Sequence, residues 1–217
     1  MKKFLLSAAF LAIALTPVIA ADTVELPVAS THDWSGLYLG AHVGGGGSKV
    51  DWTYPNGLTA DHNGSGVLGG VQVGYNIQSG NVVYGIEADI SAANIDGGTS
   101  CPNPDFSCES NVKMLGSLRG RVGFAMDKLL IYGTGGLGYG TIDISTTSDV
   151  VVLGTSGTTR TKAGWTLGAG LEYALDDHWS LKGEYKYFDF GKAKYTIDDV
   201  DAKIKIHTGV IGLNYKF

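Results

Sequence analysis

The stretch GTGGLGYG, residues 133–140, places Gly133, Gly135 and Gly138 at the G-x-G-x-x-G spacing of dinucleotide-binding loops. In such loops the glycines follow a buried strand and open a helix, whose first N–H groups hold the pyrophosphate. An apolar run precedes these glycines, but the residues that follow, TIDISTTSDVVV, have no apolar stripe of helical period. No acid lies at the distance where a ribose hydroxyl would need one. Nucleotide binding is therefore not predicted, and the glycines need another explanation.

Charged side chains form a second set that could do chemistry. They fall at alternate positions of segments whose other alternate positions are apolar, and they are Glu87, Asp89, Arg119, Arg121, Glu172, Lys182, Glu184 and Lys186. If those segments are strands, all these charges share one face, away from the apolar side chains. Enclosed in a sheet, they are stable only as ion pairs, since an unpaired buried charge costs several kcal/mol. We predict a plug of ion pairs, with a charge filter in a water-filled pore as the alternative.

Cys101 and Cys108, in SCPNPDFSCES, are the only cysteines. In an exported chain they are predicted to form a disulfide that closes a short loop and contributes about 2 to 3 kcal/mol. The alternative is a metal pair, but no histidine flanks them, so neither a metal nor a cofactor is predicted.

For catalysis, the nearest set is His207 with Tyr187 or Asp189, and alternation places no serine beside it. The chain is therefore predicted not to be an enzyme. Lysines gather around residues 191–203, where they could contact lipid phosphates, although aspartates in the same segment make a solvated rim the alternative. These lysines are Lys192, Lys194, Lys203 and Lys205.

The start of the chain, MKKFLLSAAFLAIALTPVIAAD, has two lysines, an apolar run and then small residues at Ala20 and Ala21. This pattern predicts a signal peptide over residues 1–20, because the apolar run is too short for a spanning helix. A membrane anchor helix is the alternative. A periplasmic segment is expected over 21–33, and a folded domain over 34–217. The net charge of −5 excludes nucleic acid as a partner, which would need a basic patch.

Apolar residues recur with period two in eight segments, about 35–46, 66–77, 82–92, 112–124, 129–143, 160–174, 179–190 and 204–217. Three connections, QSGN, AMDK and LDDH, are short, whereas those over 47–65, 93–111, 144–159 and 191–203 are long and polar. This pattern predicts an all-β fold, an eight-stranded antiparallel transmembrane β-barrel with short periplasmic turns and long extracellular loops.

The apolar face must point to lipid, because a barrel of this size cannot hold so many apolar side chains. Its aromatic residues are expected to form interfacial girdles, and examples are Trp34, Tyr75, Tyr84, Phe124, Tyr173, Trp179, Tyr185 and Tyr187. The other face lines the lumen, where the acids of the third strand would face the arginines of the fourth, and Glu172 would lie one strand from Lys182 and Glu184. Glycines on that face would make room for the arginines.

Five stretches carry a family resemblance: WSGLYLGAHVG, GSLRGRVGFA, YGTGGLGYG, GWTLGAGLEYALDDHWSLKGEYKYFDFG and HTGVIGLNYKF. They resemble the porin-like outer-membrane immunogenic proteins of alphaproteobacteria, which share their barrel type with outer membrane protein A and the opacity-type surface antigens. The resemblance implies an abundant surface protein of the bacterial outer membrane. The last strand, with Leu213, Tyr215 and Phe217 on one face, resembles the signal read by the barrel-assembly machinery.

The function implied is structural, with roles in envelope integrity and host contact, and with outer-membrane lipid and lipopolysaccharide as partners. Host or envelope partners would meet the long loops. Some relatives bind haem, so haem or another ligand is an alternative, with His42 and His62 as candidate ligands. A small-solute porin is the second alternative.

Overall fold

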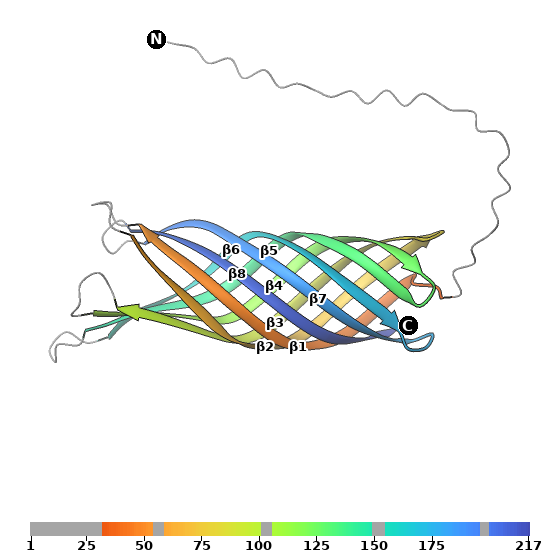
Figure 1. The fold of residues 1–217 in the computed structure, drawn as a ribbon, viewed down its shortest axis with the longest axis horizontal. Coiled ribbons are helices and arrows are strands. Elements are labelled where there is room, and N and C mark those ends of the chain that lie inside the picture. Colours follow the sequence, from red (N-terminus) through yellow and green to blue (C-terminus); the bar gives the residue numbers. More distant parts are fainter. Residues whose placement is uncertain (1–31, 54–58, 101–105, 149–154, 196–199) are drawn as a thin grey trace, which may run out of the picture.

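The computed structural model describes residues 32–217, except 54–58, 101–105, 149–154 and 196–199. Its strands close into one antiparallel barrel in chain order, which confirms the predicted fold (Figure 1). They are β1 (Gly36–Thr53), β2 (Thr59–Ser79), β3 (Val82–Ser100), β4 (Phe106–Met126), β5 (Leu129–Ser148), β6 (Thr155–Ala174), β7 (Trp179–Tyr195) and β8 (Val200–Lys216). Because β1 pairs with β8, the barrel has no open edge. Within the described ranges, no helix is long and apolar enough to cross a membrane.

The strands run well beyond the segments predicted from apolar alternation. The β1–β2 pairing continues to Thr53↔Thr59, and the β7–β8 pairing to Tyr195↔Val200, so most of each predicted long loop is paired strand. The barrel wall fixes the register, and each further residue pair then adds hydrogen bonds at little extra cost in chain entropy. We call these paired strand ends the hairpin arms; they project from one end of the barrel (Figure 1).

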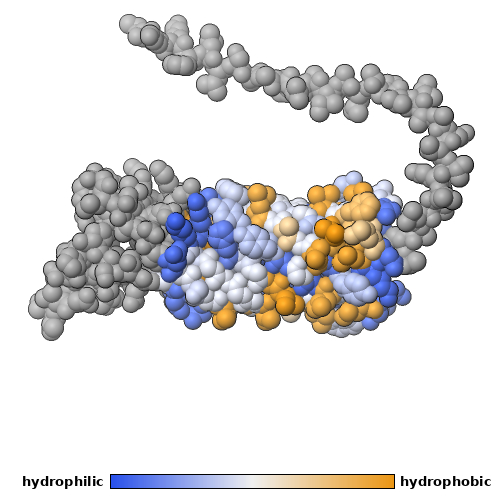
Figure 2. All heavy atoms as spheres, in the orientation of Figure 1, coloured by the Kyte–Doolittle hydropathy of each residue, from blue (hydrophilic) through white to orange (hydrophobic). Residues whose placement is uncertain are grey.

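The outer wall carries the apolar side chains that were predicted to face lipid. Val67 is 69% exposed, Leu137 66% and Ile211 64%. Figure 2 shows apolar residues concentrated toward the end of the barrel opposite the hairpin arms, and a paler middle region. Trp34 is an exception among the predicted girdle residues, because it is only 4% exposed and lies inside the barrel mouth.

The interior has three layers. At the short-turn end, Trp34 packs in an apolar cluster, and its indole N–H donates to the Asp127 carbonyl at 3.3 Å. The middle layer is polar and charged. Toward the hairpin arms a second apolar cluster fills the lumen: Leu68, Ile95, Val112, Leu115, Ile142, Phe188, Phe190, Ile204, Ile206 and Val210. Charges and glycines were predicted for this face but no apolar layer was, so the upper apolar layer is a new finding.

Candidate functional site in the barrel lumen

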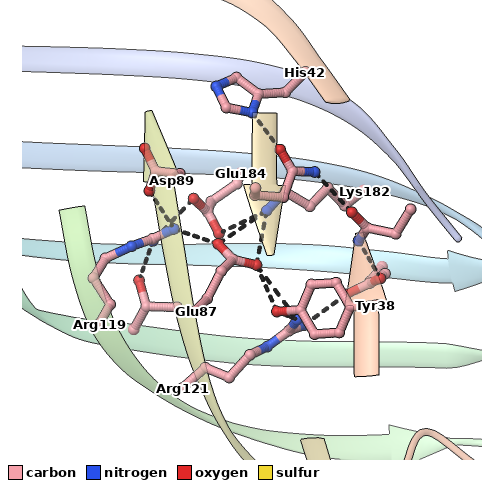
Figure 3. Close-up of polar contacts among 12 residues, drawn as sticks. Tyr38, His42, Glu87, Asp89, Arg119, Arg121, Lys182 and Glu184 are labelled. Atoms are coloured by element: carbon pink, nitrogen blue, oxygen red, sulfur yellow. Dashed lines mark hydrogen bonds and ion pairs between the residues drawn. The ribbon is translucent and has the colours of Figure 1, made fainter. Parts of the chain in front are cut away.

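The middle layer centres on Glu87 of β3, which is 1% exposed (Figure 3). Its carboxylate lies 2.5 Å from Arg119 Nη2 and 3.1 Å from Lys182 Nζ. The Tyr38 hydroxyl also donates to it, at 2.7 Å. A carboxylate that accepts this many hydrogen bonds is compensated for the loss of water, as a buried charge requires.

Two further acids complete the upper part of the network. Asp89 lies 3.1 Å from Lys186 Nζ and 3.2 Å from Arg119 Nη2, and it accepts a hydrogen bond from Ser117. Glu184 of β7 lies 2.9 Å from Arg119 Nη1. One guanidinium therefore bridges acids from opposite walls of the barrel, as Figure 3 shows.

The lower part of the network is held by Arg121. Its Nη2 lies 2.6 Å from Glu172, and its guanidinium carbon lies 4.0 Å from the centre of the Tyr132 ring. Glu172 also accepts hydrogen bonds from Ser180 at 2.6 Å and from Asn214 at 2.7 Å. Glu172 was predicted to lie near Lys182 on the neighbouring strand, and the two are in register. The ion pair, however, runs across the lumen to Arg121.

A chain of neutral groups extends the network to the remaining strands. Asn214 of β8 accepts from Gln72 of β2 at 2.7 Å, and Gln72 contacts His42 Nδ1. The other ring nitrogen of His42, Nε2, lies 2.7 Å from the Ser91 hydroxyl. Both ring nitrogens are therefore engaged, and iron ligation by His42 would have to break one of these contacts.

The lumen glycines of GTGGLGYG make room for two kinds of neighbour. A Cβ at Gly136 would overlap the backbone at Leu118 and Arg119, because the two strands approach closely there. A Cβ at Gly138 would lie 2.7 Å from the Phe188 ring. The space beside these glycines is therefore taken by the backbone of β4, which carries the arginines, and by the upper apolar layer. It is not reserved for arginine side chains, as was expected.

The structure brings the eight predicted lumen charges together in one layer. Tyr38 and Tyr132, which are both buried beside these charges, were not predicted. The alternation that places His42 inward also places Tyr38 inward, so this signal was present in WSGLYLGAHVG.

Several predictions fall outside the described parts of the chain. The signal-peptide residues Ala20 and Ala21 precede them, and Cys101 lies in the 101–105 gap, so the predicted Cys101–Cys108 disulfide stays a prediction. His62 lies in β2, but its side chain is among those not described. Leu213 and Phe217 face outward, as expected for a terminal signal strand.

The catalytic set considered from the sequence is not assembled around His207. Its Nδ1 lies 2.5 Å from the Tyr185 hydroxyl, while the Tyr187 hydroxyl donates to Asp189 at 3.3 Å. In the portion of the chain that the structure covers, no group of three or more His, Cys, Asp or Glu side chains is arranged to hold a metal ion.

A closed barrel with an apolar outer wall and a charged, filled lumen is the architecture of small bacterial outer-membrane proteins. Residues 8–217 match the outer membrane protein beta-barrel domain family, and the chain belongs to it. The chain is thus an outer-membrane protein of the immunogenic surface-protein family that its sequence resembles.

Two relatives and one solved structure are similar to the chain over most of its length. The 31 kDa outer-membrane immunogenic protein of Brucella melitensis is 36% identical over 99% of this chain and 100% of its own length. The 22 kDa outer membrane protein of Rhizobium leguminosarum bv. viciae is 35% identical over 80% of this chain and 72% of its own. The outer membrane protein OprG of Pseudomonas aeruginosa shares the fold, with a TM-score of 0.56 at 15% identity, over 87% of this chain and 98% of that one.

Proposed function

We propose that the protein is a non-catalytic structural barrel that supports the outer membrane and presents its hairpin arms to host or envelope partners. The observation that carries this proposal is a lumen filled along its length. An ion-paired layer lies between two apolar layers, and Arg119, Lys182 and Phe188 are among the side chains less than 2% exposed. Such an interior holds the barrel rigid and leaves the arms as the part that meets partners.

The ion-paired layer supports a scaffold role better than a transport role. To conduct a solute, the barrel would have to part the charge pairs and also displace both apolar layers. Removing one partner of a buried ion pair typically costs about 3 to 5 kcal/mol, so spontaneous opening would be rare.

The pore alternative is tested by reconstitution into planar bilayers, with a general porin as the positive control. We expect no single-channel conductance at any voltage. A steady, reproducible conductance from the purified protein would contradict the proposal.

The envelope role is tested in a deletion strain, which we expect to become sensitive to detergent. The full chain should restore resistance, and an unchanged envelope in the deletion strain would count against the role.

A second variant tests the hairpin arms separately from the barrel wall. Since Lys49 and Asn63 are paired in register, replacing residues 50–62 with Asn-Gly should close a tight hairpin. That variant should keep detergent resistance and lose contacts made by the first arm.

We also propose that the barrel-assembly machinery recognises the last strand through Leu213, Tyr215 and Phe217. Deleting Phe217 should reduce the amount of folded barrel in the outer membrane, measured as the fraction that keeps its fast mobility on an unheated detergent gel. An unchanged fraction would exclude the terminal aromatic as the signal.

A further inference from the structure

A shallow hollow crosses the outer wall over β5–β8 and β1. Its floor includes Gly183 of β7 and Gly209 of β8, and its borders include the outward side chains of Val43, Leu171 and Ile211. A Cβ placed on either glycine would meet no atom within 4 Å, so the space above them is open. The hollow is apolar and lies on the wall that faces lipid.

The upper border of the hollow is polar and aromatic. Tyr185 is 50% exposed and hydrogen-bonds to His207 of β8, which itself packs at 4.9 Å from the Tyr187 ring. Such amphipathic side chains belong at the interface between hydrocarbon and headgroups. The hollow therefore begins just below the surface of the membrane.

Above this border, two lysines stand opposite each other on adjacent strands. Lys49 of β1 and Lys205 of β8 are direct partners in register, and both lie on the outward face. Two cations side by side at the level of the headgroups attract a lipid phosphate. On the other side of Lys205, its partner in register is Asp189, whose carboxylate accepts hydrogen bonds from the Gly191 N–H at 2.8 Å and from Tyr187.

The lysines, the aromatic border and the hollow form one column, because Lys205, His207, Gly209 and Ile211 are successive outward residues of β8. We propose that this column seats one phosphorylated, acylated glycolipid of the outer leaflet, of the lipid A type. Its phosphate lies between Lys49 and Lys205, and one acyl chain runs down across Gly209 and Gly183. The proposal goes beyond the structural role and requires only that the hairpin arms face the outside of the cell.

The test uses the full mature chain, purified in detergent and titrated with bisphosphorylated lipid A, with retained lipid counted by native mass spectrometry. One lipid A should be retained per barrel, and dephosphorylated lipid A and phosphatidylcholine should be retained far less. The double variant Lys49→Ala/Lys205→Ala should weaken retention about tenfold, since it removes both cations at the membrane surface.

The hollow is tested by filling it. The variant Gly183→Val/Gly209→Val should fold normally, because valine suits a strand and both positions are open. It should weaken retention about fivefold by excluding the acyl chain. Gly120→Val is the matched control, since Gly120 faces outward on β4, away from the hollow, with one atom near a placed Cβ, at 3.9 Å. Equal retention by the lysine variant, by the filled variant or with dephosphorylated lipid A would each overturn the proposal. Unheated gel mobility verifies that every variant is folded.

Discussion

The same strands form the part of the barrel inside the membrane and the part just above it. Apolar side chains point outward in the first part and inward in the second. On β8 within the membrane, Ile211 points outward and is 64% exposed, whereas Asn214 points inward and is 1% exposed. Further up the same strand, Ile204 and Ile206 are buried in the lumen, and Lys205 points outward. The period of two is unchanged, so the difference comes from the solvent: hydrocarbon surrounds one part and water the other.

The level at which this inversion occurs marks the outer surface of the membrane. On β8 the outward side chains change character between Lys205 and Gly209, and on β7 the inward side chains change between Lys186 and Phe188. With a rise of about 3.3 Å per residue and a tilt of about 40°, the stretch from His207 to Phe217 spans about 25 Å, the height of a lipid-facing band.

The largest effect is expected from the charged layer of the membrane part. Glu87→Leu leaves Lys182 and Arg119 without their shared carboxylate, and it should lower the free energy of unfolding by about 4 kcal/mol. Urea titration in phospholipid vesicles measures the loss. Ile86→Leu, on the outward face of the same strand, is the control and should change little. A loss below about 1 kcal/mol would show that the pairs are not what stabilises this layer.

The next effect compares two isoleucines of one strand. Ile206→Ala opens a cavity in the upper apolar layer and should cost about 3 kcal/mol. Ile211→Ala faces lipid, which fills the space, so only the transfer free energy of about 1 to 2 kcal/mol should be lost. The same urea titration applies. Equal losses at the two positions would contradict the inversion.

A charge on the outer wall gives a smaller contrast. Ile211→Arg should destabilise the barrel by about 2 to 3 kcal/mol, because it puts a cation near the middle of the lipid band. Thr161→Arg, at an exposed position toward the hairpin-arm end of β6, should change stability by no more than about 0.5 kcal/mol. If both substitutions cost the same, the boundary has been placed at the wrong level.

The smallest effect lies in the turn between β6 and β7, outside both regions. Asp176 accepts hydrogen bonds from the backbone N–H groups of Trp179 at 2.7 Å and His178 at 2.8 Å. These bonds lower the pKa of its carboxyl below the ordinary value of 3.8. The stabilisation is therefore present above that pH and is lost as the pH falls through the lowered pKa. Urea titrations from neutral pH down to this acid range should show that the free energy of unfolding falls slightly less for Asp176→Asn than for the unsubstituted chain. An identical pH profile would rule out this contribution.

The barrel and the orientation of its faces followed from the sequence, since period-two alternation and short turns depend on local residues alone. Two features of the site did not. The partners of Arg121 and Lys182 lie across the lumen, and their identity depends on the stagger of the closed barrel, which alternation does not specify. The upper apolar layer was missed although Phe188, Phe190, Ile204 and Ile206 lie within predicted strands, because the apolar side chains were assigned to the lipid-facing side along the whole length of the strands.

The cross-lumen pairing has a consequence for the order of assembly. The β3–β4 hairpin carries Glu87 and Asp89 with two arginines, and the β6–β7 hairpin carries two glutamates with two lysines, so each hairpin is neutral in this layer. Apart from Arg119–Glu87 and Arg119–Asp89 within β3–β4, however, the short ion pairs join the two hairpins: Arg121 to Glu172, Arg119 to Glu184, Lys182 to Glu87 and Lys186 to Asp89. Each hairpin can enter the membrane without net charge in this layer, but only closure of the barrel completes the pairs between the hairpins. Insertion of the last strand and locking of the interior should then be a single cooperative event.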